Sequence, residues 1–462
     1  MKKFILILVL FVSSDLFPQS AVYAPVYDVL QNNPKSPNVN ALFKFKEIPV
    51  NASSGIPNIE IPIYTIQSGD IKIPISLRYN GGGIKVDELP TSVGLGWSLS
   101  VGGVISQKVN GLDDFLGVEG DLYDVGTYVS PMYGSVSIIQ SQTINSMTDF
   151  FAFQQNAIAS GNNYALTESR RFLGRVADGW FDAEADEFHF TTPTGTGSVF
   201  FDQSSGVFKS SNIDNWIILE HPSSGFNQGK WVLQDPNGIQ YYFEKKEMSQ
   251  SPLVNNINAR PCRTPENCDK ATTPVKYPQL ISTWFLSEVK SLRKNNSVNL
   301  SYNTAWRHYS GGFSFRAEFN TSGVYVGGTN GEVVMRDGEE NTINEIYFPE
   351  GKVKFIYSST LPNDDGPSAL EYIKIYNSKN QEKEVYKLIY QTINPVGNNG
   401  NPDLAKHILF LKEVEQSALT EQSQKLYEFG YNLQTRFPKR FLFAQDEWGY
   451  YNGNDNNVVL TP

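Results

Sequence analysis

The alternation of apolar and polar residues early in the chain is the feature that most constrains its fold. Ile59, Ile61 and Ile63 fall on one face, and the alternation resumes over 71–79 after a break at Ser68-Gly-Asp70. Alternating β-branched residues on both sides of a glycine-containing turn are typical of a β-hairpin. We therefore predict two antiparallel strands here.

A glycine-rich stretch with one tryptophan follows this hairpin. Trp97 is flanked by Gly94 and Gly96 and is soon followed by Gly102 and Gly103. Closely spaced glycines beside an indole indicate backbone packed against another layer, with the ring lying over it. We predict that Trp97 and these four glycines are structural, and that Trp97 is the anchor on which the sheet packs.

Later in the chain, apolar strands rich in Phe and Tyr recur on both sides of turns that contain Pro, Asn or Gly. Aromatic residues make up 13% of the sequence, with 24 Tyr and 29 Phe, and such residues favour strands. We predict a mainly β fold in which successive antiparallel hairpins form extended sheets, because an isolated hairpin is not stable alone. The predicted strands are 187–190 with 199–202, 231–234 with 239–243, 346–348 with 353–357, 371–376 with 385–390, and 426–431.

A small helical insertion is predicted over 143–179, where apolar residues recur at helical spacing. Within it a second helix is expected over 167–178. The flanking regions are a β region over 46–142, which ends in a surface loop from about residue 112, and a hairpin-rich β region over 180–462.

The first 20 residues have the pattern of a signal peptide. Lys2 and Lys3 precede a wholly apolar run over 4–12, which is too short to span a membrane. We predict cleavage near Ser20-Ala21, an extended leader over 21–45, and export to the cell surface or the extracellular space.

The net charge of −10 argues against nucleic acid or an anionic membrane as a partner. The sequence contains no Gly-x-Ser-x-Gly elbow and no phosphate-binding loop, so we predict no cofactor and no catalytic role. Cys262 and Cys268 are the two cysteines. In an exported chain they favour a short disulfide over a zinc site, since the four histidines stand far apart.

Two stretches are candidate binding sites, each with a simpler structural interpretation. Asp182, Glu184 and Asp186 would share one face of a strand and form a weak calcium candidate; the alternative is a solvated strand entry. Near the end of the chain, Trp448, Tyr450 and Tyr451 precede an Asn-rich run and are candidate glycan contacts. The favoured interpretation of these three is a polar turn whose aromatic residues lie in the core.

Several of these stretches resemble the N-terminal region of the RHS/YD-repeat proteins of Bacteroidetes. The resemblance rests on GIPNIEIPIY at 55–64, SVGLGWSLSVGGVI at 92–105, VNGLDD at 109–114, AEADEFHF at 183–190, IYFPEGKVKFIY at 346–357 and AQDEWGYYNG at 444–453. It implies a secreted β-shell protein whose partners are downstream RHS/YD repeats or a toxin cargo. Those repeats do not occur before Pro462, so a fragment, a truncated product and a stand-alone module all remain open.

The leading hypothesis is thus a secreted, non-catalytic structural module of an RHS/YD-type shell. The first alternative is a carbohydrate-binding or adhesion module at the cell surface. The second is a glycan-active hydrolase, which needs two carboxylates facing each other across a cleft; Asp182 and Glu187 are the pair considered.

Overall fold

A computed structural model describes part of the chain, and all of the described residues lie within the compact unit 51–462. They are 59–83, 85–108, 136–139, 142–144, 147–177, 186–202, 207–210, 215–222, 229–250, 280–319, 325–361, 366–395, 407–418, 423–433, 437–440, 442 and 444–453. The predicted signal peptide, the leader and the cysteine pair lie outside the described residues.

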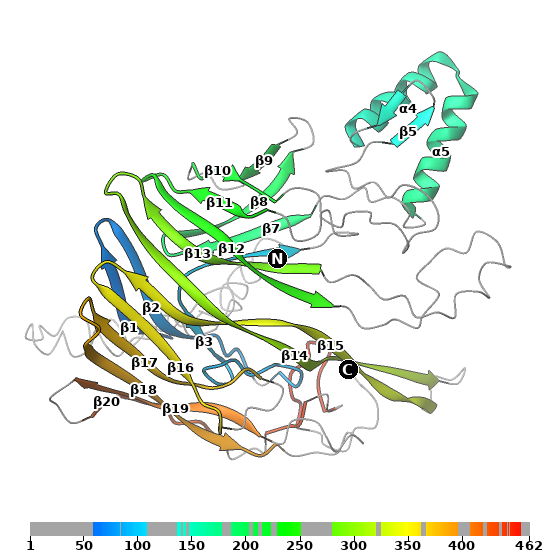
Figure 1. The fold of residues 1–462 in the computed structure, drawn as a ribbon. Coiled ribbons are helices and arrows are strands. Elements are labelled where there is room, and N and C mark those ends of the chain that lie inside the picture. Colours follow the sequence, from blue (N-terminus) through cyan, green and yellow to red (C-terminus); the bar gives the residue numbers. More distant parts are fainter. Residues whose placement is uncertain are drawn as a thin grey trace, which may run out of the picture. The chain divides into compact units, whose positions relative to one another are not determined.

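The elements are mostly strands (Figure 1). The first group is β1 (Ile59–Ser68), β2 (Ile71–Tyr79), β3 (Trp97–Ser100), β4 (Val104–Lys108), β5 (Val136–Ile139) and β6 (Gln142–Ile144), followed by helices α4 (Met147–Ser160) and α5 (Asn163–Ala177). The second is β7 (Glu187–Thr192), β8 (Gly195–Asp202), β9 (Val207–Ser210), β10 (Ile217–Glu220), β11 (Trp231–Gln234), β12 (Ile239–Gln250) and β13 (Leu280–Ser291). The third is β14 (Asn296–Phe319), β15 (Tyr325–Phe348), β16 (Gly351–Tyr357), β17 (Leu370–Asn377), β18 (Glu382–Ile393), β19 (Ile408–Ala418) and β20 (Gln424–Glu428).

The prediction of a mainly β fold built from antiparallel hairpins is confirmed. One sheet has 15 strands, in the order β20-β19-β18-β17-β16-β15-β12-β13-β4-β7-β8-β9, with β10, β11 and β14 paired off this path. Two smaller sheets have the orders β1-β2-β3 and β5-β6. Consecutive hairpins thus add edge to edge over much of the large sheet.

The β1–β2 hairpin forms where the alternation predicts it, but its register contains an irregularity. The pairing shifts between Pro62 and Tyr64, so that Ile63 is the extra residue of a β-bulge. Both Ile61 and Ile63 are buried, and beyond the bulge the buried position moves to Ile66. The bulge therefore keeps one face of the strand apolar although the sequence alternation changes phase.

The longest hairpin, β14–β15, was not among those predicted. Each of its strands has 24 residues, and their pairing runs from Asn299 opposite Tyr347 to Phe319 opposite Tyr325. The many Gly, Asn and charged residues in these strands hide the alternation. One strand ends earlier than predicted: β20 ends at Glu428, whereas the predicted strand continues to Tyr431.

Aromatic side chains fill the core of the large sheet. Trp231 and Trp284 are both fully buried, with ring centroids 6.2 Å apart in an edge-to-face arrangement. Phe188 lies 5.0 Å from Trp231 and 6.1 Å from Trp284. Such contacts between rings add to the burial of their large apolar area, so aromatic packing helps to hold β7, β11 and β13 together.

Both helices lie within the predicted insertion 143–179. The second begins at Asn163, not at Thr167, because the side-chain Oδ1 of Asn162 accepts a hydrogen bond from the N–H of Ala165 at 3.1 Å and caps the helix. The predicted loop before the insertion contains strand β5, which is a correction. Among the described residues no helix is long and apolar enough to cross a membrane.

Candidate functional site: a cavity where the large sheet branches

The large sheet branches around β13. Strand β12 pairs with β13, β13 with β14, β14 with β15, and β15 again with the end of β12, which closes a circuit of four strands. The ladder between β13 and β14 ends at Glu288 and Asn299, and β4 pairs with β13 over 283–285 instead. A branch of this kind leaves a gap between strands that side chains must bridge.

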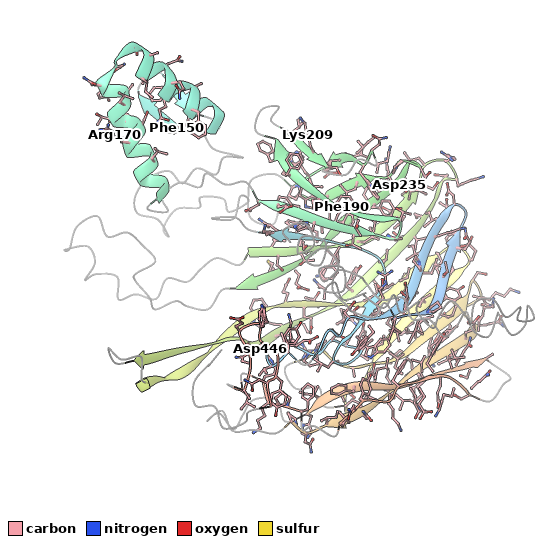
Figure 2. All side chains as sticks on the ribbon, turned by 180° about the vertical axis from the view of Figure 1, so that it is seen from behind. Phe150, Arg170, Phe190, Lys209, Asp235 and Asp446 are labelled. Atoms are coloured by element: carbon pink, nitrogen blue, oxygen red, sulfur yellow. The ribbon has the colours of Figure 1, made fainter. Side chains whose placement is uncertain are left out.

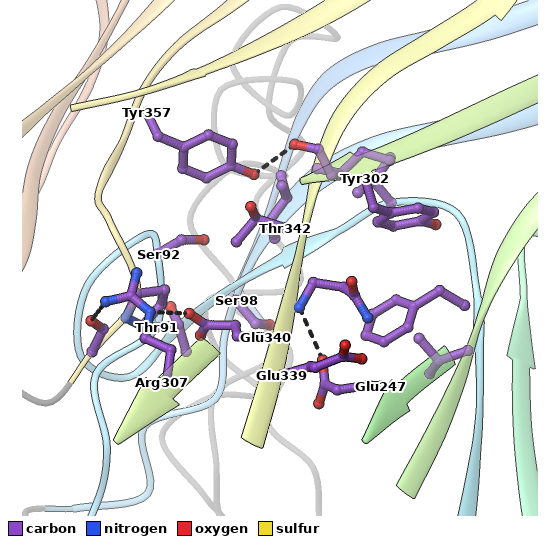
Figure 3. A pocket seen from close by; sticks show the side chains of 18 of the residues that line it. Thr91, Ser92, Ser98, Glu247, Tyr302, Arg307, Glu339, Glu340, Thr342 and Tyr357 are labelled. Carbon is purple, nitrogen blue, oxygen red and sulfur yellow. Dashed lines mark hydrogen bonds and ion pairs between the residues drawn. The ribbon is translucent and has the colours of Figure 1, made fainter. Parts of the chain in front are cut away.

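A cavity of about 660 Å³ lies at this branch (Figure 3). This volume is in the range of sites that hold small molecules. Its lining comes from the segment 89–104, from strands β12 to β16, and from Gly366 and Pro367. The polar lining residues are Thr91, Ser92, Ser98, Glu247, Tyr302, Arg307, Glu339, Glu340, Asn341, Thr342 and Tyr357.

Glu247, on β12, bridges the gap to β15. One oxygen of its carboxyl group accepts a hydrogen bond from the backbone N–H of Asn341 at 3.1 Å, and the Asn341 side chain donates to the carbonyl of Lys246 at 2.8 Å. Burial raises the pKa of Glu247 to about 7, and the charges of Glu340 and Glu339 add to this rise against the hydrogen bond from Asn341. Near neutral pH this carboxyl group is therefore only partly ionised.

An ion pair lies beside it. The Nε of Arg307, on β14, is 2.7 Å from a carboxylate oxygen of Glu340, on β15, and one of its terminal nitrogens donates to the carbonyl of Gly366 at 3.4 Å. Burial raises the pKa of Glu340, and Arg307 opposes that rise. With one guanidinium among three carboxyl groups, the cavity carries an excess of negative charge when all are ionised.

Two tyrosines complete the wall of the cavity. The hydroxyl of Tyr302 donates to the carbonyl of Leu286 at 2.7 Å across the end of the ladder, and that of Tyr357 donates to the carbonyl of Ile343 at 2.9 Å. Burial is the main cause that raises the pKa of each, so both remain neutral donors. None of these groups was predicted from the sequence.

The structure places Trp97 in the main core. Its side chain is buried, and its Nε1–H donates to the hydroxyl of Tyr431 at 2.9 Å. The rings of Tyr79 and Phe429 lie 5.2 and 4.8 Å from it.

The four glycines around Trp97 each lie close to a different part of the chain. A Cβ on Gly94, whose φ is +95°, would lie 3.0 Å from backbone atoms of β19. One on Gly103 would overlap the backbone carbonyl of Thr191 in β7. Gly96 lies against the ring of Tyr79 and Gly102 against the side chain of Leu300. Gly94 and Gly103 thus let this segment run directly over neighbouring backbone.

Of the calcium candidates, only Asp186 is described; Asp182 and Glu184 lie outside the described residues. Asp186 is buried and accepts a hydrogen bond from the Gln107 side chain at 2.6 Å. The neighbouring Glu187 pairs with Lys108 at 3.5 Å. In the part of the chain that the structure describes, no group of three His, Cys, Asp or Glu side chains is arranged to hold a metal ion.

The aromatic residues near the end of the chain lie on a tight turn, across which Gln445 pairs with Tyr451. Asp446, which is labelled in Figure 2, lies in this turn. Its carboxylate accepts from the N–H groups of Trp448 at 3.0 Å and Tyr450 at 2.8 Å. The expectation that these rings lie in the core is wrong for Trp448, which is 70% exposed. Tyr450 and Tyr451 are half-buried.

Comparison with known proteins gives little guidance. No family model matches the sequence, and no curated protein does. Among solved structures, the chain is similar to the N-terminal domain of effector protein SpvB from Salmonella typhimurium strain LT2, with a TM-score of 0.29 and 12% identity over 78% of this chain and 98% of that one. A likeness with so low a TM-score supports no inference about function.

Proposed function

We propose that the protein is an exported structural module, the N-terminal part of an RHS/YD-type shell, without a catalytic role of its own. One observation carries this proposal: consecutive hairpins add edge to edge to one sheet of 15 strands. A single cluster of buried apolar side chains runs from β1 to β19. An extended wall of this kind suits a protein that encloses or supports something else.

Strand β20 is an edge strand of the large sheet. Among the described residues β20 pairs only with β19, so its outer edge presents unpaired backbone N–H and C=O groups. An edge of this kind accepts a further strand by backbone hydrogen bonding. We propose that in the native assembly this edge is covered, either by downstream RHS/YD repeats or by a cargo.

Amide hydrogen exchange of the native exported product tests this function. Amides of β20 are expected to exchange much more slowly in the native product than in the isolated chain 21–462. Strand β18, which lies between two neighbours in the sheet, is the internal control and is expected to be protected in both. Equal exchange of β20 in both preparations would contradict the proposal, as would a native product that is retained in the cytoplasm with residues 1–20 intact.

A second candidate function is contact with carbohydrate at the Asp446 turn. The observation that favours it is the exposed Trp448, held on a turn that Asp446 fixes by two hydrogen bonds. An exposed indole on a rigid turn offers a flat apolar face on which a sugar ring can stack.

Binding to a glycan array distinguishes the two functions. If the turn contacts glycans, Trp448→Ala abolishes the signal, whereas Tyr427→Ala, which removes another exposed ring, leaves it intact. The absence of any glycan signal with the unmodified protein would remove this candidate and leave the structural proposal standing.

A further inference from the structure

The hydrogen-bond donors around the branch cavity are almost all used within the protein. Tyr302 and Tyr357 donate to backbone carbonyls. The side chain of Asn341 donates to the carbonyl of Lys246 and accepts from the Thr304 hydroxyl at 2.8 Å, and its backbone N–H binds Glu247. Among the described side chains that line the cavity, the donors left over are the Ser92 hydroxyl and part of the Arg307 guanidinium.

Acceptors, by contrast, remain available. Glu247 uses one carboxyl oxygen for Asn341, and Glu340 uses one for Arg307. Glu339 has no partner among the described residues. Three carboxyl groups that line one cavity therefore offer free oxygens, and Figure 3 shows Glu247, Glu339 and Glu340 gathered on the same side of it.

The rest of the wall is apolar. Leu89, Pro90, Leu99, Val101, Val104, Phe285, Ile343 and Pro367 line the cavity beside the polar groups. A ligand that suits this surface has donors and positive charge at one end and an aliphatic body at the other. The carboxyl groups do not converge as a metal site does, since no metal-holding group of three such side chains occurs in the described part of the chain.

We propose that the branch cavity is a binding site for an aliphatic primary amine, whose ammonium group donates to Glu247 and Glu339 while its carbon chain lies against the apolar wall. An ammonium group has three donors and no acceptor, which matches an acceptor-rich and donor-poor cavity. This site is independent of the proposed structural role and adds a ligand to it.

Ionisation of Glu247 is linked to this binding. The charged groups that act on the Glu247 carboxyl are Glu340, Glu339 and Lys245. Arg307 also lines the cavity and forms an ion pair with Glu340. A bound ammonium ion favours the ionised carboxylate, so binding releases a proton and tightens as the pH rises from 6 to 8. The amine itself stays protonated over this range.

Titration calorimetry with n-pentylamine at pH 8 tests the proposal, with 1-pentanol as the uncharged probe of similar length. Pentylamine is expected to bind and the alcohol is not. Glu247→Gln and Glu339→Gln are each expected to weaken pentylamine binding by about tenfold or more, as loss of a charged hydrogen bond does. Glu350→Gln, at an exposed turn, is the matched control and is expected to bind as the wild type does.

Three results would overturn the proposal: equal binding of the alcohol and the amine, unchanged affinity in Glu339→Gln, or calcium chloride binding at least as tightly as pentylamine. Glu339 has no partner to lose among the described residues, so its variant is expected to fold even if Glu247→Gln does not. Circular dichroism of each variant checks that the fold is intact before the titration.

Discussion

The packing around Trp97 and the cavity around Glu247 join distant parts of the chain in opposite ways. At Trp97, glycines bring backbone against backbone, and the one polar atom of the indole finds the Tyr431 hydroxyl, which itself donates to the carbonyl of Leu411 at 2.7 Å. At Glu247, strands separate, and a carboxyl group with a raised pKa spans the gap. The junction at Trp97 is dry and contributes stability through buried apolar contacts. The polar junction costs stability and leaves a cavity.

The largest expected effect is at the dry junction. Trp97→Ala removes a buried ring and its hydrogen bond, and is expected to lower the free energy of unfolding by about 3–5 kcal/mol. Chemical denaturation monitored by circular dichroism measures this loss. An unchanged midpoint of unfolding would show that Trp97 does not anchor the sheet.

At the polar junction, the substitution of Glu247 is expected to raise the free energy of unfolding rather than lower it, and the effect is expected to depend on pH. The pKa of Glu247 is raised from 4.5 to about 7, so its contribution to stability is fully present below about pH 4.5 and lost as the pH rises through 7. Glu247→Gln keeps an acceptor for Asn341 without the charge, and is expected to stabilise the protein at pH 8 by up to about 3 kcal/mol.

Denaturation curves of the Glu247→Gln variant at pH 5 and pH 8 measure this difference, with Glu350→Gln expected to keep the pH dependence of the wild type. If Glu247→Gln lost stability at pH 8 relative to the wild type, the junction would depend on the charged carboxylate.

A smaller loss is expected from one added methyl group at the dry junction. In Gly103→Ala the new Cβ overlaps the carbonyl of Thr191 in β7, and shifting the backbone to relieve this costs about 1–3 kcal/mol. Gly430→Ala is the matched control, since a Cβ there meets nothing within 4 Å. Thermal melts of both variants measure the difference, and equal melting temperatures would mean that the close approach at Gly103 is not needed.

The smallest effect is expected where a tryptophan is exposed. Trp448 is 70% exposed, so Trp448→Ala is expected to change the free energy of unfolding by no more than about 0.5 kcal/mol. The same denaturation assay compares it with Trp97→Ala. A loss as large as that of Trp97→Ala would place Trp448 in a structural contact.

Local patterns predict the strands here but not the cavity. The isoleucines of β1 and β2 alternate because a strand presents every second side chain to the core, so their hairpin is readable from the sequence. Glu247 lies in a strand of ordinary appearance. Its partner Asn341 is 94 positions away, in a hairpin whose polar residues mask the alternation. Nothing local to either residue signals that their strands meet at a branch.

The place of β4 in the large sheet has a consequence for how the chain folds. Ile105 in β4 faces Phe190 in β7 and Trp284 in β13, and all three side chains are buried. During synthesis from the N-terminus, one edge of β4 has no partner until β13 is made, roughly 180 residues later. Synthesis of that length of chain takes on the order of ten seconds or more. Contacts between such distant residues slow folding. The centre of the sheet therefore closes late, and until β13 arrives, β4 and β7 expose an apolar edge to which chaperones and other chains have access.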